Sequence, residues 1–177
     1  TESKTPMVHT SGSVGTNVFK NRENFGVFYP LHSFNKNIDV NFNDIPICIE
    51  ANNSELEKKL ISLANSISNS VHILNSKQRE QLHIAAVFAS NFTNHMMSIS
   101  EQILISNKMN FDLLKPLISN TFEKIKNNHP KDVQTGPAKR KDYLIIKKHL
   151  ESLEDYDDLK IIYSKISNHI ISNNFNE

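Results

Sequence analysis

The sequence predicts an α/β segment followed by an all-α region. Short apolar runs separated by turn-forming residues fill the first fifty residues, and an amphipathic helix and one more short apolar run follow them. Beyond residue 75 the apolar residues recur at helical spacing. Alternation of strand and helix is typical of a Rossmann-like sheet. We therefore expect the C-terminal strands of a Rossmann-like domain over residues 1–74 and a helical domain over residues 75–177.

The composition limits the classes of function. The 177 residues are 38% hydrophobic and 22% charged, as in globular domains. Twenty basic and nineteen acidic side chains are scattered along the chain, which predicts no nucleic-acid surface. The longest apolar stretch, 82–97, is interrupted by polar residues and is shorter than the ~20 residues of a membrane span. We expect neither nucleic acid nor membrane as a partner.

The strands and the first helix are predicted from apolar runs. Residues 7–9, 25–29, 45–49 and 71–74 are strand candidates, and their continuous apolar character favours strands covered on both faces, as in parallel sheets. Between the last two, Ser54 is a predicted helix N-cap for a helix that extends to about residue 68. The single cysteine, Cys48, lies in an apolar run and is expected to be a buried small hydrophobe, which fits a reducing cytoplasm.

The remaining residues predict helices. Residues 76 to about 105 contain neither Gly nor Pro, and apolar residues recur there at intervals of three and four, which predicts one long helix. Asn110 or Asp112 can cap a second helix, and a polar loop over 131–141 follows it. Two more helices are predicted, one capped by Asp142 and one that starts near Asp157 or Asp158.

The long helix carries a narrow polar stripe. At ~100° per residue, its polar members fall within one arc, and apolar residues cover most of the remaining circumference. The stripe consists of His83, Val87, Ser90, Asn91, Asn94 and Ser98. Such a stripe either faces solvent or lines a cleft. It contains no Lys, Arg or Glu, which exposed helix faces usually carry, so its neutral chemistry favours a cleft wall.

Three other positions are candidates for ligand contact. His32 and His9 each follow a predicted strand, where open α/β sheets place ligand-binding loops, although either residue could serve only in packing or at the surface. The segment 134–142 is either a simple turn between helices or a site at which Arg140 binds a carboxylate or phosphate. The eight histidines and one cysteine show no paired metal-ligand spacing, so we predict no metal site.

Five segments appear in order and are specific in combination. They are His9-Thr10-Ser11-Gly12-Ser13, residues 26–34, residues 45–50, residues 78–79 with 82–92, and Gln134-Thr135-Gly136-Pro137-Ala138 with Arg140 and Asp142. Together they resemble a bacterial family of uncharacterised proteins with a Rossmann-like first domain and a helical second domain of unknown function. Members are described as candidate NADP oxidoreductases or as similar to deazaflavin-dependent NADP reductases. The second domain is similar to the helical domain of 6-phosphogluconate dehydrogenase.

The resemblance implies a cofactor, NADP or NAD, for the full-length protein, with His9, Ser11 and Gly12 in the cofactor-binding segment. In the family a glycine-rich phosphate loop precedes that segment. A βαβ unit takes roughly 30 residues or more, so we expect on the order of 80 residues to be missing before Thr1. The present sequence has four glycines and no Gly-x-Gly-x-x-Gly. We therefore expect no tight dinucleotide binding by this fragment.

The resemblance also implies roles for the stripe. In the wider dehydrogenase superfamily, the corresponding long helix presents a proton-transfer residue and an Asn to the substrate. The stripe has no Lys, so His83 is the expected general acid or base and Asn91 the expected hydrogen-bonding partner of the substrate. Further substrate contacts are expected from Arg140, Thr135, Asn94 and His32.

Three hypotheses follow for the function. The first is a reductase or dehydrogenase acting on a small carbonyl or imine compound, with a homodimer formed through the helical domain. The second is a cofactor-binding regulatory or sensor protein without turnover. The third is a helical dimerisation module.

Overall fold

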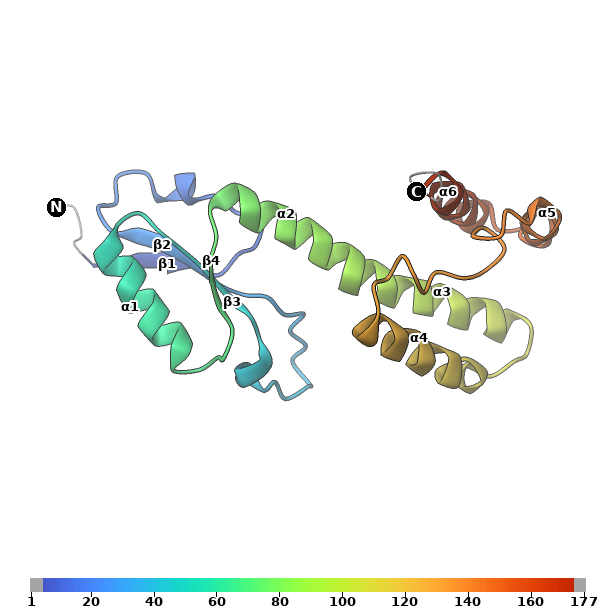
Figure 1. Ribbon diagram of the computed structural model, residues 1–177, viewed down its shortest axis with the longest axis horizontal. Coiled ribbons are helices and arrows are strands. Elements are labelled where there is room, and N and C mark those ends of the chain that lie inside the picture. The colour runs from blue at the N-terminus through green and yellow to red at the C-terminus, as the bar shows by residue number, and fades with distance from the viewer. Residues whose placement is uncertain (1–4, 174–177) are drawn as a thin grey trace. The chain divides into compact units, whose positions relative to one another are not determined.

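The computed structural model describes residues 5–173, which divide into two compact units between Met96 and Met97 (Figure 1). In chain order, the first unit contains β1 (Met7–His9), η1 (Thr16–Phe19), β2 (Phe25–Pro30), η2 (Phe42–Asp44), β3 (Ile47–Ala51), α1 (Ser54–Asn65), β4 (Val71–Ile73), α2 (Ser76–Ala86) and η3 (Val87–Phe92). Helix α3 (Thr93–Ser106) spans the division, and η4 (Phe111–Leu114), α4 (Lys115–Asn127), α5 (Tyr143–Ser152) and α6 (Asp157–Asn173) complete the second unit. An α/β part followed by an all-α part is confirmed. The sheet ends at Ile73, beside the boundary predicted after residue 74.

The sheet has the order β1-β2-β3-β4 and is mixed. Strands β1 and β2 are parallel, β2 and β3 are antiparallel, and β3 and β4 are parallel. The expectation of a parallel sheet is therefore wrong at its centre. Helix α1 connects β3 to β4 as a crossover, whereas residues 31–46 contain only the short η2 and return the chain directly to a neighbouring antiparallel strand.

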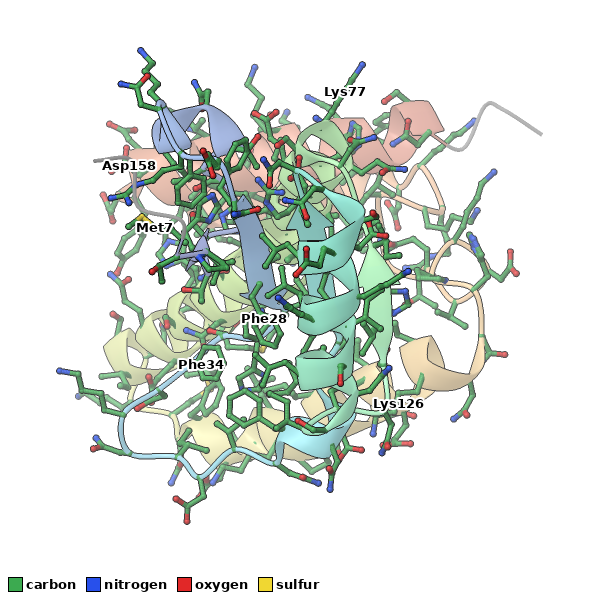
Figure 2. All side chains as sticks on the ribbon, turned by 90° about the vertical axis from the view of Figure 1, so that its left-hand side faces the viewer. Met7, Phe28, Phe34, Lys77, Lys126 and Asp158 are labelled. Carbon is green, nitrogen blue, oxygen red and sulfur yellow. The ribbon has the colours of Figure 1, made fainter. Side chains whose placement is uncertain are left out.

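Two apolar layers cover the sheet, one on each face. Helix α1 covers one face, where Leu56 and Leu60 pack against Ile47 and Ile49, and Phe28, labelled in Figure 2, packs against the same cluster. The other face holds a second cluster of Val27, Tyr29 and Cys48, against which Leu31, Leu74 and Leu82 pack. Cys48 is 2% exposed, so its prediction as a buried hydrophobe is confirmed.

Gly26 allows β2 to pack close to β3 and α1. A Cβ at this position would lie 2.4 Å from the carbonyl oxygen of Glu50 and 3.2 Å from a methyl carbon of Leu60. No side chain fits there without moving the backbone of β3, so the close packing of β2, β3 and α1 depends on a glycine.

Two boundaries differ from the prediction. Strand β3 begins at Ile47 because Pro46 has no N–H to donate to a ladder. Helix α1 is capped by the side chain of Asn53, which accepts the N–H of Leu56 at 2.9 Å, rather than by Ser54. The same helix ends at Asn65, and the buried hydroxyl of Ser68 donates to the carbonyl of Ile45 at 2.6 Å.

The long helix predicted from residue 76 to about residue 105 is confirmed as the uninterrupted succession of α2, η3 and α3. A capping box formed by Asn75 and Gln78 starts it. Segment η3 is π-helical, which was not predicted. Because π-helical bonds join residues five apart, each residue there turns the helix by less than in an α-helix, and the side chains beyond η3 lose the phase of those before it.

The helices of the second unit begin where the sequence predicts. Asn110 caps η4, which leads into α4, and Asp142 caps α5 by accepting the N–H of Ile145 at 3.2 Å. Helix α6 begins at Asp157. In the part of the chain that the structure describes, no helix is both long and apolar enough to cross a membrane.

Candidate functional site

A hollow of about 640 Å³ lies on the face of the first unit where β2, α2 and η3 come together. Its lining residues come from the end of β2 and the loop after it, from α2 and from η3. They are Tyr29, Leu31, His32, Ser33, Leu82, His83, Ala85, Ala86, Val87, Ala89, Ser90 and Asn91. Four of them, from Val87 to Asn91, belong to the π-helical segment, and such segments occur frequently at functional sites.

The structure brings three of the predicted site residues to this hollow: His83, Asn91 and His32. Asn94 does not line it, because η3 changes the helical phase between His83 and Asn94. Apolar residues of the same helix line it as well, so the hollow does not follow the predicted polar stripe alone. Phe88 and Phe92 are 64% and 48% exposed, and the expected burial of most of the helix circumference is wrong for the first unit.

Tyr29 and His83 form a hydrogen-bonded pair in the wall of the hollow. The Tyr29 hydroxyl lies 3.2 Å from Nδ1 of His83, and the two rings meet edge to face with their centroids 6.2 Å apart. Burial, with a smaller contribution from Cys48, raises the pKa of Tyr29 above its ordinary value, so its hydroxyl stays protonated.

Gly12 packs directly against this pair. A Cβ on Gly12 would lie 2.7 Å from Nδ1 of His83 and 2.8 Å from the Tyr29 hydroxyl. Gly12 belongs to the segment that the resemblance assigns to the cofactor, and His83 is the expected acid or base. The fold therefore brings these two predicted elements into contact.

The loop after β1 is organised by its own side chains. Ser11 donates its N–H to Nδ1 of His9 at 3.2 Å, and the Ser11 hydroxyl accepts the N–H groups of Ser13 and Val14 at 3.3 and 3.2 Å. The His9 ring stacks on Phe19 with centroids 5.4 Å apart. Burial, and then the charge of Arg79, lowers the pKa of His9. Its Nε2 is buried and forms no hydrogen bond of good geometry within residues 5–173, although a weak interaction with the backbone of Gly15 opposes the lowering of the pKa.

A buried arginine ties this loop to α2 and β3. Arg79 is 1% exposed and forms an ion pair with Glu50 through its Nη1, while its Nη2 donates to the carbonyl of Val14 at 2.6 Å. The Ser76 hydroxyl lies 2.9 Å from each carboxylate oxygen of Glu50. Because Arg79 lies one helical turn before His83, this network fixes the turn of α2 that carries His83 and the loop that packs against it.

Sequence reasoning assigned no role to Tyr29, Glu50 or Arg79. All three lie within the segments that carry the family resemblance, and that was the available signal. A second signal was the position of Arg79, on a helix and four residues before the expected acid or base.

Thr135 and Arg140 lie in the second unit. Both are exposed, and the turn between them contains Gly136 with a φ of 102°, a left-handed conformation that favours glycine. The backbone N–H of Arg140 donates to the carbonyl of Gly136 at 3.2 Å. Among residues 5–173, no group of three or more His, Cys, Asp or Glu side chains is arranged to hold a metal ion.

Comparison with known proteins adds a family and a fold. The model of a domain of unknown function, DUF2520, matches residues 45–170. A solved structure from Bacteroides fragilis, described as "putative NADP oxidoreductase BF3122", is 40% identical, with a TM-score of 0.90 over 94% of this chain and 65% of that one. Protein TM1727 from Thermotoga maritima is 23% identical and shares the fold, with a TM-score of 0.72 over 94% of this chain and 69% of that one. No curated protein matches.

The chain thus spans about two thirds of the length of these two solved structures. Its four-stranded mixed sheet and the helices that follow match a Rossmann-like part and a helical domain. The fold is shared with the Bacteroides fragilis structure described as a "putative NADP oxidoreductase".

Proposed function

The chain belongs to the family defined by the domain of unknown function DUF2520, and from this premise we propose that the complete protein is an NAD(P)-dependent oxidoreductase acting on a small carbonyl or imine compound. The observation that carries the proposal is the contact between Gly12 and the Tyr29–His83 pair. This contact joins the segment expected to bind the cofactor to the residue expected to transfer a proton. Tyr29 and His83 line a hollow large enough for a small molecule.

The residues around His9 fit the nicotinamide end of the cofactor. The buried Nε2 of His9 forms no hydrogen bond of good geometry among the described residues, so it could hydrogen-bond to a carboxamide. At Gly12 the backbone comes close to its neighbours because no Cβ fits. The bound cofactor would supply the hydride. We propose His9, Ser11 and Gly12 as the residues of this chain that contact the nicotinamide end.

His83 and Asn91 are the proposed catalytic residues. His83 gives a proton to the substrate oxygen or nitrogen, and the Asn91 amide hydrogen-bonds to the same substrate. His32, which lines the hollow from the loop after β2, is the third proposed substrate contact. The roles expected for Thr135, Arg140 and Asn94 stay predictions, because the first two lie in the second unit and Asn94 does not line the hollow.

The test uses the product of the complete gene and follows NADPH oxidation at 340 nm with a panel of small ketones, aldehydes and cyclic imines. We expect His83→Ala to lose activity by roughly 100-fold or more, because general acid catalysis contributes 10²–10⁴-fold. The matched control is His95→Ala, since His95 is exposed on the same long helix and does not line the hollow.

Two outcomes would contradict the proposal. NADPH binding without oxidation of any compound in the panel would favour a cofactor-binding sensor. A loss of thermal stability in His83→Ala that accounts for the loss of activity would make His83 a structural residue.

We also propose that the partner of the helical unit is a second copy of this chain. The resemblance to the 6-phosphogluconate dehydrogenase helical domain suggests it, and exposed apolar side chains on α4, α5 and α6 support it. Leu117, Leu144 and Ile161 are 59%, 84% and 57% exposed, and a second copy could cover them. Sedimentation velocity tests this: a dimer is expected, and a monomer at micromolar concentrations would refute it.

A further inference from the structure

The Tyr29–His83 pair determines which nitrogen of His83 can meet a ligand. Nδ1 of His83 is the atom that faces the Tyr29 hydroxyl, at 3.2 Å. His83 is half-buried, and its ring is part of the lining of the hollow. Nε2 is therefore the ring nitrogen available to a bound molecule.

The burial of Tyr29 decides the direction of this hydrogen bond. Tyr29 is 8% exposed, and within residues 5–173 the hydroxyl has Nδ1 of His83 as its hydrogen-bond partner. If Nδ1 carried the proton and donated it, the hydroxyl proton would have no acceptor among the described side chains, and an unpaired buried donor is destabilising. Donation by the hydroxyl avoids this cost. His83 is then the tautomer with its proton on Nε2, because a neutral imidazole that accepts at one nitrogen donates at the other.

Gly12 closes one side of the pair. Because a Cβ on Gly12 would already be within 2.8 Å of both the hydroxyl and Nδ1, there is no room on that side for a water molecule that could accept the hydroxyl proton. The loop after β1 therefore leaves no room for a second partner of Tyr29 on that side, and this favours donation by the hydroxyl to His83.

The described lining of the hollow is poor in ionisable side chains: besides Tyr29 it contains the two histidines His32 and His83. None of its residues is Lys, Arg, Asp or Glu, and Leu31, Leu82 and Val87 supply apolar wall. A carboxylate or phosphate in this hollow would lose water without gaining an ion-pair partner from the lining, which is costly. An uncharged molecule with one hydrogen-bond acceptor would lose little hydration free energy and would gain the His83 N–H as a donor.

We propose that the hollow binds an uncharged ligand whose carbonyl oxygen or imine nitrogen accepts the Nε2–H of His83, and that Tyr29 is the positioning residue that keeps this proton on Nε2. The inference rests on the proposed function for the reaction. It specifies in addition that the substrate is uncharged and that His83 carries its proton on Nε2. In a reduction, hydride adds to the substrate carbon and the substrate oxygen takes the Nε2 proton. The Tyr29 hydroxyl proton then moves to Nδ1, and water in the hollow, which Tyr29 also lines, returns a proton to the phenolate. An alkoxide is a stronger base than a phenolate, so the transfer is favourable.

The first test measures the tautomer directly. In the complete gene product labelled with ¹⁵N-histidine, long-range ¹H–¹⁵N NMR correlations distinguish the two tautomers, and His83→Gln identifies the His83 signals. We expect the Nε2–H tautomer in the native protein and a mixture in Tyr29→Phe, which lacks the donor. The Nδ1–H tautomer in the native protein, or an unchanged tautomer in Tyr29→Phe, would overturn the inference.

A second variant keeps both functional groups. Gly12→Ala should push the ends of the Tyr29 and His83 side chains apart and produce the same mixture of tautomers. Gly15→Ala is the matched control, because a Cβ there would approach only the Asn17 side chain, at 3.1 Å. A change in Gly15→Ala as large as that in Gly12→Ala would mean that the tautomer reports on the loop as a whole, and the role of the pair would be rejected.

The ligand test uses two probes of nearly equal shape, benzoylformamide, which is neutral, and benzoylformate, which is an anion. Titrations followed by the His83 NMR signals should show at least about tenfold tighter binding of the amide, because an unpaired charge in an apolar site costs more than 1.4 kcal/mol. Equal or tighter binding of the anion would overturn the inference, and loss of that anion binding in Arg140→Gln would assign it to Arg140. Amide binding without NADPH oxidation leaves the inference standing and refutes the oxidoreductase proposal. Oxidation of NADPH with the anion as the better substrate would support the oxidoreductase proposal and overturn the inference of an uncharged ligand.

Discussion

The two units of this chain bury their apolar residues very differently. In the first unit, two clusters close both faces of the sheet, and Val27 and Ile47 are 0% exposed. In the described part of the second unit, Ala138 and Ile146 are the hydrophobic residues that are buried, while Leu113 and Leu144 are 67% and 84% exposed. The sheet unit thus has a core of its own. The helical unit has apolar side chains that a further surface could cover, whereas the hollow proposed as the site is lined by residues of the sheet unit alone.

The largest effect is expected from the ion pair between Arg79 and Glu50. Glu50→Ala leaves the Arg79 charge buried without its partner, and such changes cost about 3–5 kcal/mol of folding free energy. Urea unfolding of the first unit measures it. The control is Glu55→Ala, which removes an ion pair with Lys59 on the surface of α1 and should leave unfolding unchanged. A small loss of folding free energy in Glu50→Ala would mean that water reaches Arg79 and that Arg79 is less buried than its packing indicates.

A pair of core substitutions tests the comparison itself. Ile47→Ala removes a side chain that is fully buried between β3 and α1, and should cost about 2–5 kcal/mol. Ile161→Ala, on α6, removes one that is 57% exposed and should change the free energy of unfolding by no more than about 0.5 kcal/mol. The effect of Ile161→Ala should be measured at low and at high protein concentration. A larger effect at high concentration would support the proposed contact with a second copy of the chain. A large effect of Ile161→Ala at low concentration would show that the helical unit buries this face without a partner.

The spacing of apolar residues predicted the helices and strands well, but not the relative direction of neighbouring strands. It located the four strands and the helix from residue 76 onward, because burial on one side or both is recorded in local periodicity. It did not reveal that β2 and β3 are antiparallel, since a run of apolar residues carries no information about strand direction. The π-helical turn of η3 was also missed, because the prediction assumed a constant rotation of ~100° per residue along the whole helix.

The candidate site was predicted in part for the same reason. His83, Asn91 and His32 could be chosen from residue type and position. Tyr29 could not, because its contact with His83 joins residues 54 positions apart and depends on how α2 lies on the sheet. The roles of Thr135 and Arg140 stay predictions, since they lie in the other unit.

A helix cap in each unit offers a test of smaller size. Asn75→Ala removes the capping box of α2, and Asp142→Ala removes the cap of α5; each should cost about 1 kcal/mol. If the two units unfold separately, thermal unfolding followed by circular dichroism should show two transitions, with Asn75→Ala lowering one midpoint and Asp142→Ala the other. One transition lowered equally by both variants would show that the helical unit is stable only together with the sheet unit.

The smallest expected effect concerns pH and tests whether the loop after β1 belongs to the closed core. Burial and Arg79 lower the pKa of His9 in the folded chain, so the unfolded chain takes up a proton first as the pH falls. Stability should therefore decrease as the pH falls below about 6.5, the ordinary histidine value, and level off below the folded pKa. His9→Phe keeps a ring to stack on Phe19 and has no proton to gain, so its midpoint of thermal unfolding should depend less on pH over this range. An unchanged pH dependence in His9→Phe would show that His9 is hydrated when folded, and the loop that holds Gly12 against His83 would then be outside the core.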